Sequence, residues 1–157
     1  MKSESRDPKF EANIKAQRTE VSKRYDLEER TLQFAKDIRV FVKMLPRTIA
    51  NEQDIRQLVS ASGSVGANYI EANESLSKKD FLLRIKISRK EAKESRYWLR
   101  LLDTGDNDSA DNTRDALIQE ATELMNIFGA IVRKSQGEVK SEIRNTKLGT
   151  RGNVQNS

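Results

Sequence analysis

The residues of this chain best suited to chemistry are carboxylates and amides spaced along two consecutive helical patterns. Glu91 and Glu94 lie on one side of the second of these patterns, and Ser64, Asn68 and Glu71 share a face of the first. Carboxylates clustered in a helical bundle hold metal ions or transfer protons when Glu-x-x-His pairs accompany them. This chain contains no His and no Cys, so the same side chains are better explained as a structural polar network. Its predicted members are Arg56, Ser64, Asn68, Glu71, Glu91 and Glu94.

The sequence also lacks the residues and motifs that other kinds of catalytic site require. Without His, the commonest general base and zinc ligand are both missing, and without Cys there is no thiolate. The segment Gly63-Ser-Val-Gly66 lacks the Lys and Ser or Thr of a phosphate-binding loop and lies inside a helical pattern. We therefore expect a protein that is not an enzyme, with no catalytic residues, no cofactor, no metal and no small-molecule substrate.

The helical pattern from Lys78 to Leu102 has three distinct faces. One is the expected core stripe and includes Ile85, Ala92 and Leu99. The second combines Glu91 and Glu94 with large apolar residues. A helix that is apolar on two faces needs cover on both, so the apolar members of the second face are candidates for an oligomer interface. They are Ile87, Trp98 and Leu101.

The third face is almost purely basic. Its cations recur every three or four residues and are the candidates for contact with nucleic-acid phosphates: Lys86, Arg89, Lys93, Arg96 and Arg100. A row of charges is also what an ordinary solvated helix face looks like. The first hypothesis is a non-enzymatic interaction module that binds RNA or an RNA-handling protein. The alternative is a purely structural homo-oligomer with a protein partner and no role in nucleic-acid binding.

These faces need helices to position them, and periodicity predicts four. The first begins at Asp26-Leu-Glu-Glu29, a capping pattern, and ends before Pro46. The second begins at Asn51 and runs to about Ser75, and the third is capped by Ser77. The fourth follows an Asp-rich loop and ends near Gly137. Four amphipathic helices joined by short loops predict an all-α, up-and-down four-helix bundle.

The excess charge of the chain lies near its ends. The formal net charge is +5; residues 1–24 carry seven basic and four acidic side chains (7 − 4 = +3), and residues 137–157 carry four and two (4 − 2 = +2). Residues 25–136 are therefore neutral overall and form the predicted bundle. We expect residues 1–24 to be mobile, although Phe10, Ile14, Gln17 and Val21 are spaced for one more marginal helix, and residues 137–157 to be disordered.

The run from Leu58 to Leu102 resembles the four-helix-bundle proteins encoded in intervening sequences of bacterial large-subunit ribosomal RNA genes. The resemblance rests on Ser64-Val-Gly-Ala-Asn-Tyr-Ile-Glu-Ala72, on Lys79-Asp-Phe81, and on Lys90-Glu-Ala-Lys-Glu-Ser-Arg-Tyr-Trp-Leu99. It extends more loosely from about Asp26 to Lys134. The resemblance implies an up-and-down bundle that assembles into a homopentameric ring, with no settled biochemical activity and a relationship to RNA suggested by gene location.

The composition sets the expected location. No apolar run approaches the roughly 20 residues that span a bilayer, and the first residues lack the apolar stretch of a secretory signal. We therefore expect a soluble, cytoplasmic protein with no membrane association.

Overall fold

The structure is a computed structural model that describes residues 7–152, with side chains described for residues 7–19 and 26–149. Within that range the chain forms four helices and no strands: α1 (Pro8–Val42), α2 (Ile49–Asn73), α3 (Lys78–Leu101) and α4 (Asp108–Gly152). The all-α prediction is confirmed. No helix among these residues is long and apolar enough to cross a membrane.

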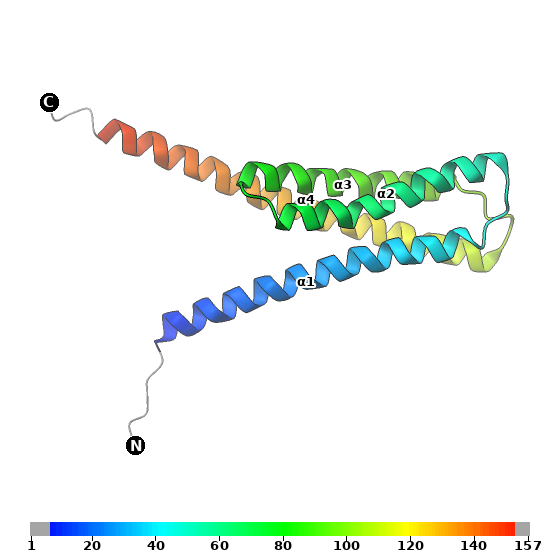
Figure 1. The fold of residues 1–157 in the computed structure, drawn as a ribbon, viewed down its shortest axis with the longest axis horizontal. Helices are drawn as coiled ribbons and strands as arrows, with labels where there is room; N and C mark the ends of the chain where they lie inside the picture. The colour runs from blue at the N-terminus through cyan, green and yellow to red at the C-terminus, as the bar shows by residue number, and fades with distance from the viewer. Residues whose placement is uncertain (1–6, 153–157) are drawn as a thin grey trace, which may run out of the picture.

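Each helix packs against the helix that follows it in the chain, and α1 also contacts α4. Contacts are most extensive between α2 and α3 and between α3 and α4, whereas α1 contacts α2 and, least of all, α4. Figure 1 shows α1 and α4 meeting near the two loops at one end and diverging toward the termini. The regular up-and-down four-helix bundle is therefore matched only in part, because α1 leaves the others along its first half.

The first helix begins 18 residues before the predicted start at Asp26. Asp7 caps α1 through a hydrogen bond that its side chain accepts from the Lys9 backbone N–H (2.9 Å), and Pro8 occupies the first turn. Pro is favoured there because its missing N–H would have no helical partner in any case. No Gly or Pro lies between Pro8 and Asp26, so nothing ends the helix, and the capping pattern at Asp26 falls inside it. The structure thus differs from the expected mobile segment over residues 8–24, and residues 1–6 lie outside the described range.

The fourth helix also continues past its predicted end. Gly137 lies inside α4, although a Gly there costs about 1 kcal/mol relative to Ala. No Pro follows it, so the helix continues to Gly152 where disorder is expected from the sequence. Residues 153–157 lie outside the described range. An ion pair between Glu142 in this extension and Lys78, the first residue of α3, joins the two helices.

The two inner helices start close to the predicted positions. Ser77 caps α3 by accepting a hydrogen bond from the Asp80 N–H (3.1 Å), which confirms that start. The cap of α2 is Thr48, whose hydroxyl accepts from the Asn51 N–H (3.1 Å). Asn51 itself is buried inside the first turn.

The core lies between Leu27 and Val132. The buried side chains are those of the predicted stripes, and the largest of them are Phe34, Ile38, Phe41, Leu58, Ile85, Leu99, Leu124 and Phe128. Among the described side chains, the two helical extensions therefore contribute none to this core. At Gly66, α1 and α2 come so close that an added Cβ would lie 2.8 Å from the Thr31 hydroxyl oxygen.

An ion-pair cluster joins α1 to α4 across their shared side. Arg30 donates from Nε and Nη2 to the two carboxylate oxygens of Glu120 (2.7 and 2.9 Å), and from Nη2 to Glu123 (2.6 Å). The bidentate geometry is the strong form of this interaction, and it holds the pKa of Glu120 below its usual value. This cluster marks the place where α1 is still attached to α4 before the two diverge.

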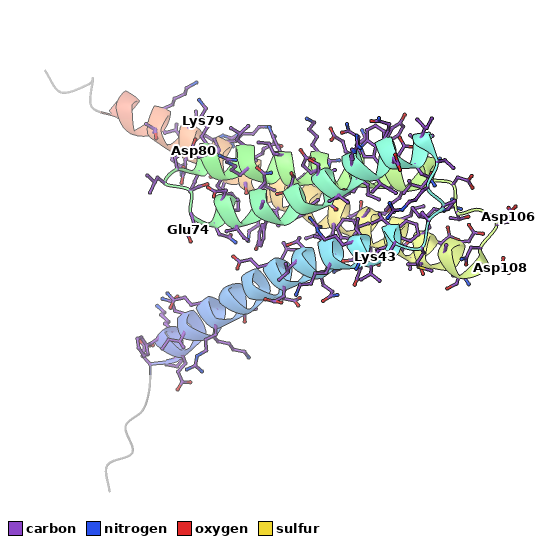
Figure 2. The ribbon with its side chains drawn as sticks, turned by 45° about the vertical axis from the view of Figure 1, so that its right-hand side comes forward. Lys43, Glu74, Lys79, Asp80, Asp106 and Asp108 are labelled. Carbon is purple, nitrogen blue, oxygen red and sulfur yellow. The ribbon has the colours of Figure 1, made fainter. Side chains whose placement is uncertain are left out.

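The α1–α2 and α3–α4 loops, at the end of the molecule where α1 and α4 meet, are joined by one buried amide. Asn51 Nδ2 donates to the carbonyl oxygens of Pro46 (2.9 Å) and Asp103 (2.8 Å), and its Oδ1 accepts from the Asp103 N–H (3.0 Å). The side chain is only 1% exposed. Asn51 thus connects the α1–α2 loop to the α3–α4 loop, and Figure 2 shows these two loops side by side near Asp106 and Asp108.

Candidate interaction site on α3

The polar residues expected to form one network are brought together only in part. Asn68 on α2 donates from Nδ2 to the Ser64 carbonyl oxygen (2.8 Å) and accepts at Oδ1 from Arg84 Nη1 on α3 (3.1 Å). Glu94 lies 3.6 Å from Lys90, one turn earlier on the same helix. The structure therefore places Asn68 at the α2–α3 contact and keeps Glu94 within α3.

Arg56 and Glu71 do not join this set, because both side chains are exposed. The carboxylate of Glu91 is half-buried and forms no hydrogen bond or ion pair with any residue that the structure describes; only its backbone carbonyl is used, by the Ser95 hydroxyl (2.8 Å). The reason is geometric. A helical face shared by Glu91 and Glu94 places their charges side by side, and no described cation forms an ion pair with Glu91.

This environment raises the pKa of Glu91. The largest cause is burial, which disfavours the charged form, and the neighbouring charge of Glu94 acts in the same direction, whereas Lys90 opposes both.

Among the described residues no group of three or more Asp, Glu, His or Cys side chains is placed to hold a metal ion.

We expect Glu91→Gln to make stability less dependent on pH. A folded-state pKa above the unfolded value of about 4.3 contributes stability that is complete below that pH and is lost as pH rises through the folded pKa. The wild type should therefore lose free energy of unfolding between pH 4 and pH 7 relative to Glu91→Gln. Urea unfolding at the two pH values measures this difference, with exposed Glu29→Gln as the control. Parallel pH dependences for wild type and Glu91→Gln would contradict the prediction.

The fully buried polar groups in the middle of α2 and α3 are serine hydroxyls, and these serines belong to the predicted core stripes rather than to the predicted polar network. The hydroxyl of Ser88 on α3 donates to the Val65 carbonyl oxygen on α2 (3.0 Å), and Ser62 and Ser95 bond within their own helices. All three are 0% exposed. Their signal in the sequence is a Ser at a core position of an otherwise apolar stripe. A small side chain there lets helices approach closely, which is the reason α2 and α3 pack so extensively.

The second face of α3 carries an exposed apolar surface, which we call the α3 apolar face. Ile87 and Trp98 are half-buried, and Leu101 is 50% exposed. Two residues that the sequence analysis missed extend it: Leu83 and Tyr97, each 56% exposed. The Tyr97 and Trp98 rings meet edge to face with centroids 5.1 Å apart. No side chain that the structure describes covers these exposed groups.

The basic face lies on the α4 side of α3. Lys86, Arg89, Lys93 and Arg100 are exposed, and Arg96 is half-buried. Arg89 reaches across to α4, where its Nε lies 3.5 Å from the position that a Cβ on Gly129 would occupy. None of the five cations forms an ion pair with a residue in the described part of the chain.

Comparison with known proteins identifies the class to which this helical assembly belongs. Residues 23–130 match the model of the 23S rRNA-intervening sequence protein family, and the chain belongs to that family. The family is of unknown function and is named for intervening sequences of 23S rRNA. The resemblance identified from the sequence is thereby confirmed.

A solved structure supports the same assignment. A protein of unknown function from the S23 ribosomal protein family of Bacteroides thetaiotaomicron is 28% identical, with a TM-score of 0.55, over 67% of this chain and 96% of that chain. No curated protein matches the chain.

Proposed function

We propose that the protein is a non-enzymatic, cytoplasmic interaction module that self-assembles through the α3 apolar face. In this proposal an up-and-down four-helix bundle is the folding unit, and a second copy covers the apolar side chains that the single chain leaves in water. The family resemblance favours a ring of five copies.

The observation that carries the proposal is the exposure of Leu83, Tyr97 and Leu101 on one helix face. Exposed apolar side chains gathered on one helix face mark interaction sites in soluble proteins. The ring pair of Tyr97 and Trp98 supplies the aromatic side chains that interfaces favour. Glu91 lies on the same side of α3 and already has a raised pKa, so further burial by a second copy costs less than burial of an ordinary carboxylate.

We expect Leu101→Glu to dissociate the assembly. A charge placed on a buried apolar contact loses its hydration without gaining a partner, which should reduce the mass to that of one 17.9-kDa chain. Multi-angle light scattering at about 5 µM, after size-exclusion chromatography, measures the mass. The matched control is Val40→Glu on α1, which is 62% exposed but lies away from α3, and it should keep the wild-type mass. A wild type that elutes as a single chain would refute the proposal.

A further inference from the structure

The basic face of α3 does not end with that helix. Gly129 on α4 lies opposite Arg89, and the same face of α4 continues toward the C-terminus through Arg133, Lys140, Arg144 and Lys147. The spacings from Gly129 onward are four, seven, four and three residues, which keeps all of them on one side of a helix. The cations of α3 and α4 therefore face the same side of the molecule.

The two rows meet at Gly129. A Cβ at this position would lie 3.4 Å from Arg133 Nη1 and 3.5 Å from Arg89 Nε. Two guanidinium groups from different helices thus converge above a residue with no side chain, and neither forms an ion pair with a described residue. Like charges held this close repel each other unless an anion lies between them, and guanidinium groups bind phosphate in the bidentate manner.

The acidic residues of the α4 extension lie on other faces. Glu138 and Glu142 are each two residues from Lys140, which places them well away from its direction on the helix. Glu142 is also engaged by Lys78. The cationic side of the extension is therefore not neutralised by its own carboxylates, and Figure 1 shows the extension projecting beyond the α2–α3 turn.

We propose that this α3–α4 surface binds the phosphodiester backbone of a nucleic acid, with the Arg89–Arg133 pair as its central phosphate contact. We call it the phosphate track. It runs along α3 from Arg100 to Lys86 and then along α4 from Arg133 to Lys147, about 40 Å at 1.5 Å per helical residue. The exposed Tyr97 lies between Lys93 and Arg100, but cations outnumber this aromatic side chain along the track, so the track contacts mainly the phosphodiester backbone. The α4 half lies outside the matched family region, residues 23–130.

Fluorescence anisotropy of the full-length protein with a labelled 30-nucleotide single-stranded RNA, at 50 and 200 mM KCl, tests the track. We expect binding at 50 mM that weakens steeply with salt. The variant Arg89→Glu/Arg133→Glu should bind at least about tenfold more weakly, and its slope of log K against log salt should be shallower by about 1.4, since each lost phosphate contact is worth about 0.7 on a single strand. Lys140→Glu/Arg144→Glu should weaken binding similarly.

The matched control is Lys36→Glu/Lys43→Glu, which makes the same change in net charge at exposed positions on α1 and at its C-cap. It should stay within about threefold of wild type. Equal losses in track and control variants, or a wild type that does not bind at 50 mM KCl, would overturn the proposal. A 20-base-pair RNA duplex of mixed sequence, run in parallel, identifies which form of backbone the track prefers.

Light scattering separates this proposal from self-assembly. The track variants should keep the wild-type mass, because the α3 apolar face is on the other side of α3. A track variant that loses RNA affinity and mass together would show that these cations support assembly, and would count against the track. Salt-dependent RNA binding by a protein that is a monomer would support the track and refute only the self-assembly.

Discussion

Replacing Asn51 by Asp should lower the free energy of unfolding by about 3–5 kcal/mol at pH 7, because each buried group left without its partner costs about 1–3 kcal/mol. The Asn51 amide donates to two carbonyl oxygens, those of Pro46 and Asp103. An ionised carboxylate donates to neither and brings a negative charge against both. The side chain is 1% exposed, so water does not replace the lost donors.

This effect should also depend on pH with a predictable sign. Burial next to carbonyl oxygens raises the folded-state pKa of the new Asp above its unfolded value of about 3.9. The protonated form is tolerated best, so the variant should be least destabilised near pH 4 and should lose stability as pH rises through its folded-state pKa. Urea unfolding at pH 4 and pH 7 measures the difference. The control Asn126→Asp, at an exposed position of α4, should change stability little. A loss for Asn51→Asp no larger than that of the control would show that the two loops are not held by this amide.

Replacing Gly66 by Ala should destabilise the protein by about 1–3 kcal/mol, the usual cost of forcing extra atoms into a packed contact. The new methyl group would lie 2.8 Å from the Thr31 hydroxyl oxygen and 3.2 Å from its Cβ. Thr31 is itself buried and donates to carbonyl oxygens of its own helix. It cannot turn away, so α1 and α2 must separate.

Gly63, three residues earlier on the same helix, provides the matched control. A Cβ there meets only the mobile end of Arg39, at 3.5 Å. Gly63→Ala should therefore gain up to about 1 kcal/mol from helix propensity. In the Gly66→Ala background, Thr31→Ala removes the colliding oxygen, so the double variant should lose less than the sum of the two single variants. Thermal or urea unfolding of the four variants measures this coupling. Equal effects of Ala at the two glycines would contradict the close helix contact at Gly66.

The interior stripes of the bundle were predictable from spacing alone. Apolar residues repeated every three or four positions place the same side chains inward whatever the partner helix is, and Phe34, Leu58, Ile85 and Phe128 are all buried as expected. Helix ends were less predictable. The capping signal at Ser77 was correct, whereas the one at Asp26 was not, because a capping pattern begins a helix only where the preceding residues cannot continue one.

The rows of residues that make up the candidate surfaces were predictable from the sequence, but their positions relative to the neighbouring helices were not. Periodicity separates the core stripe of α3, its mixed apolar and acidic face, and its basic face, since each depends only on the direction of side chains around one helix. Periodicity does not show which neighbour lies beside each row. Arg56 and Glu71 were therefore expected in a shared network from which the structure excludes them, and Tyr97 was missed.

The amino-acid sequence by itself determined the helical class, the composition of the core and the family, because these follow from residue types and their local spacing. Only the tertiary structure decided that Asn51 joins two loops, that Thr31 packs directly against Gly66, and that Arg89 and Arg133 both lie next to Gly129. Each of these contacts depends on the distance between helices that are far apart in the chain. That distance is set by the packing of all four helices together, so no local pattern encodes it.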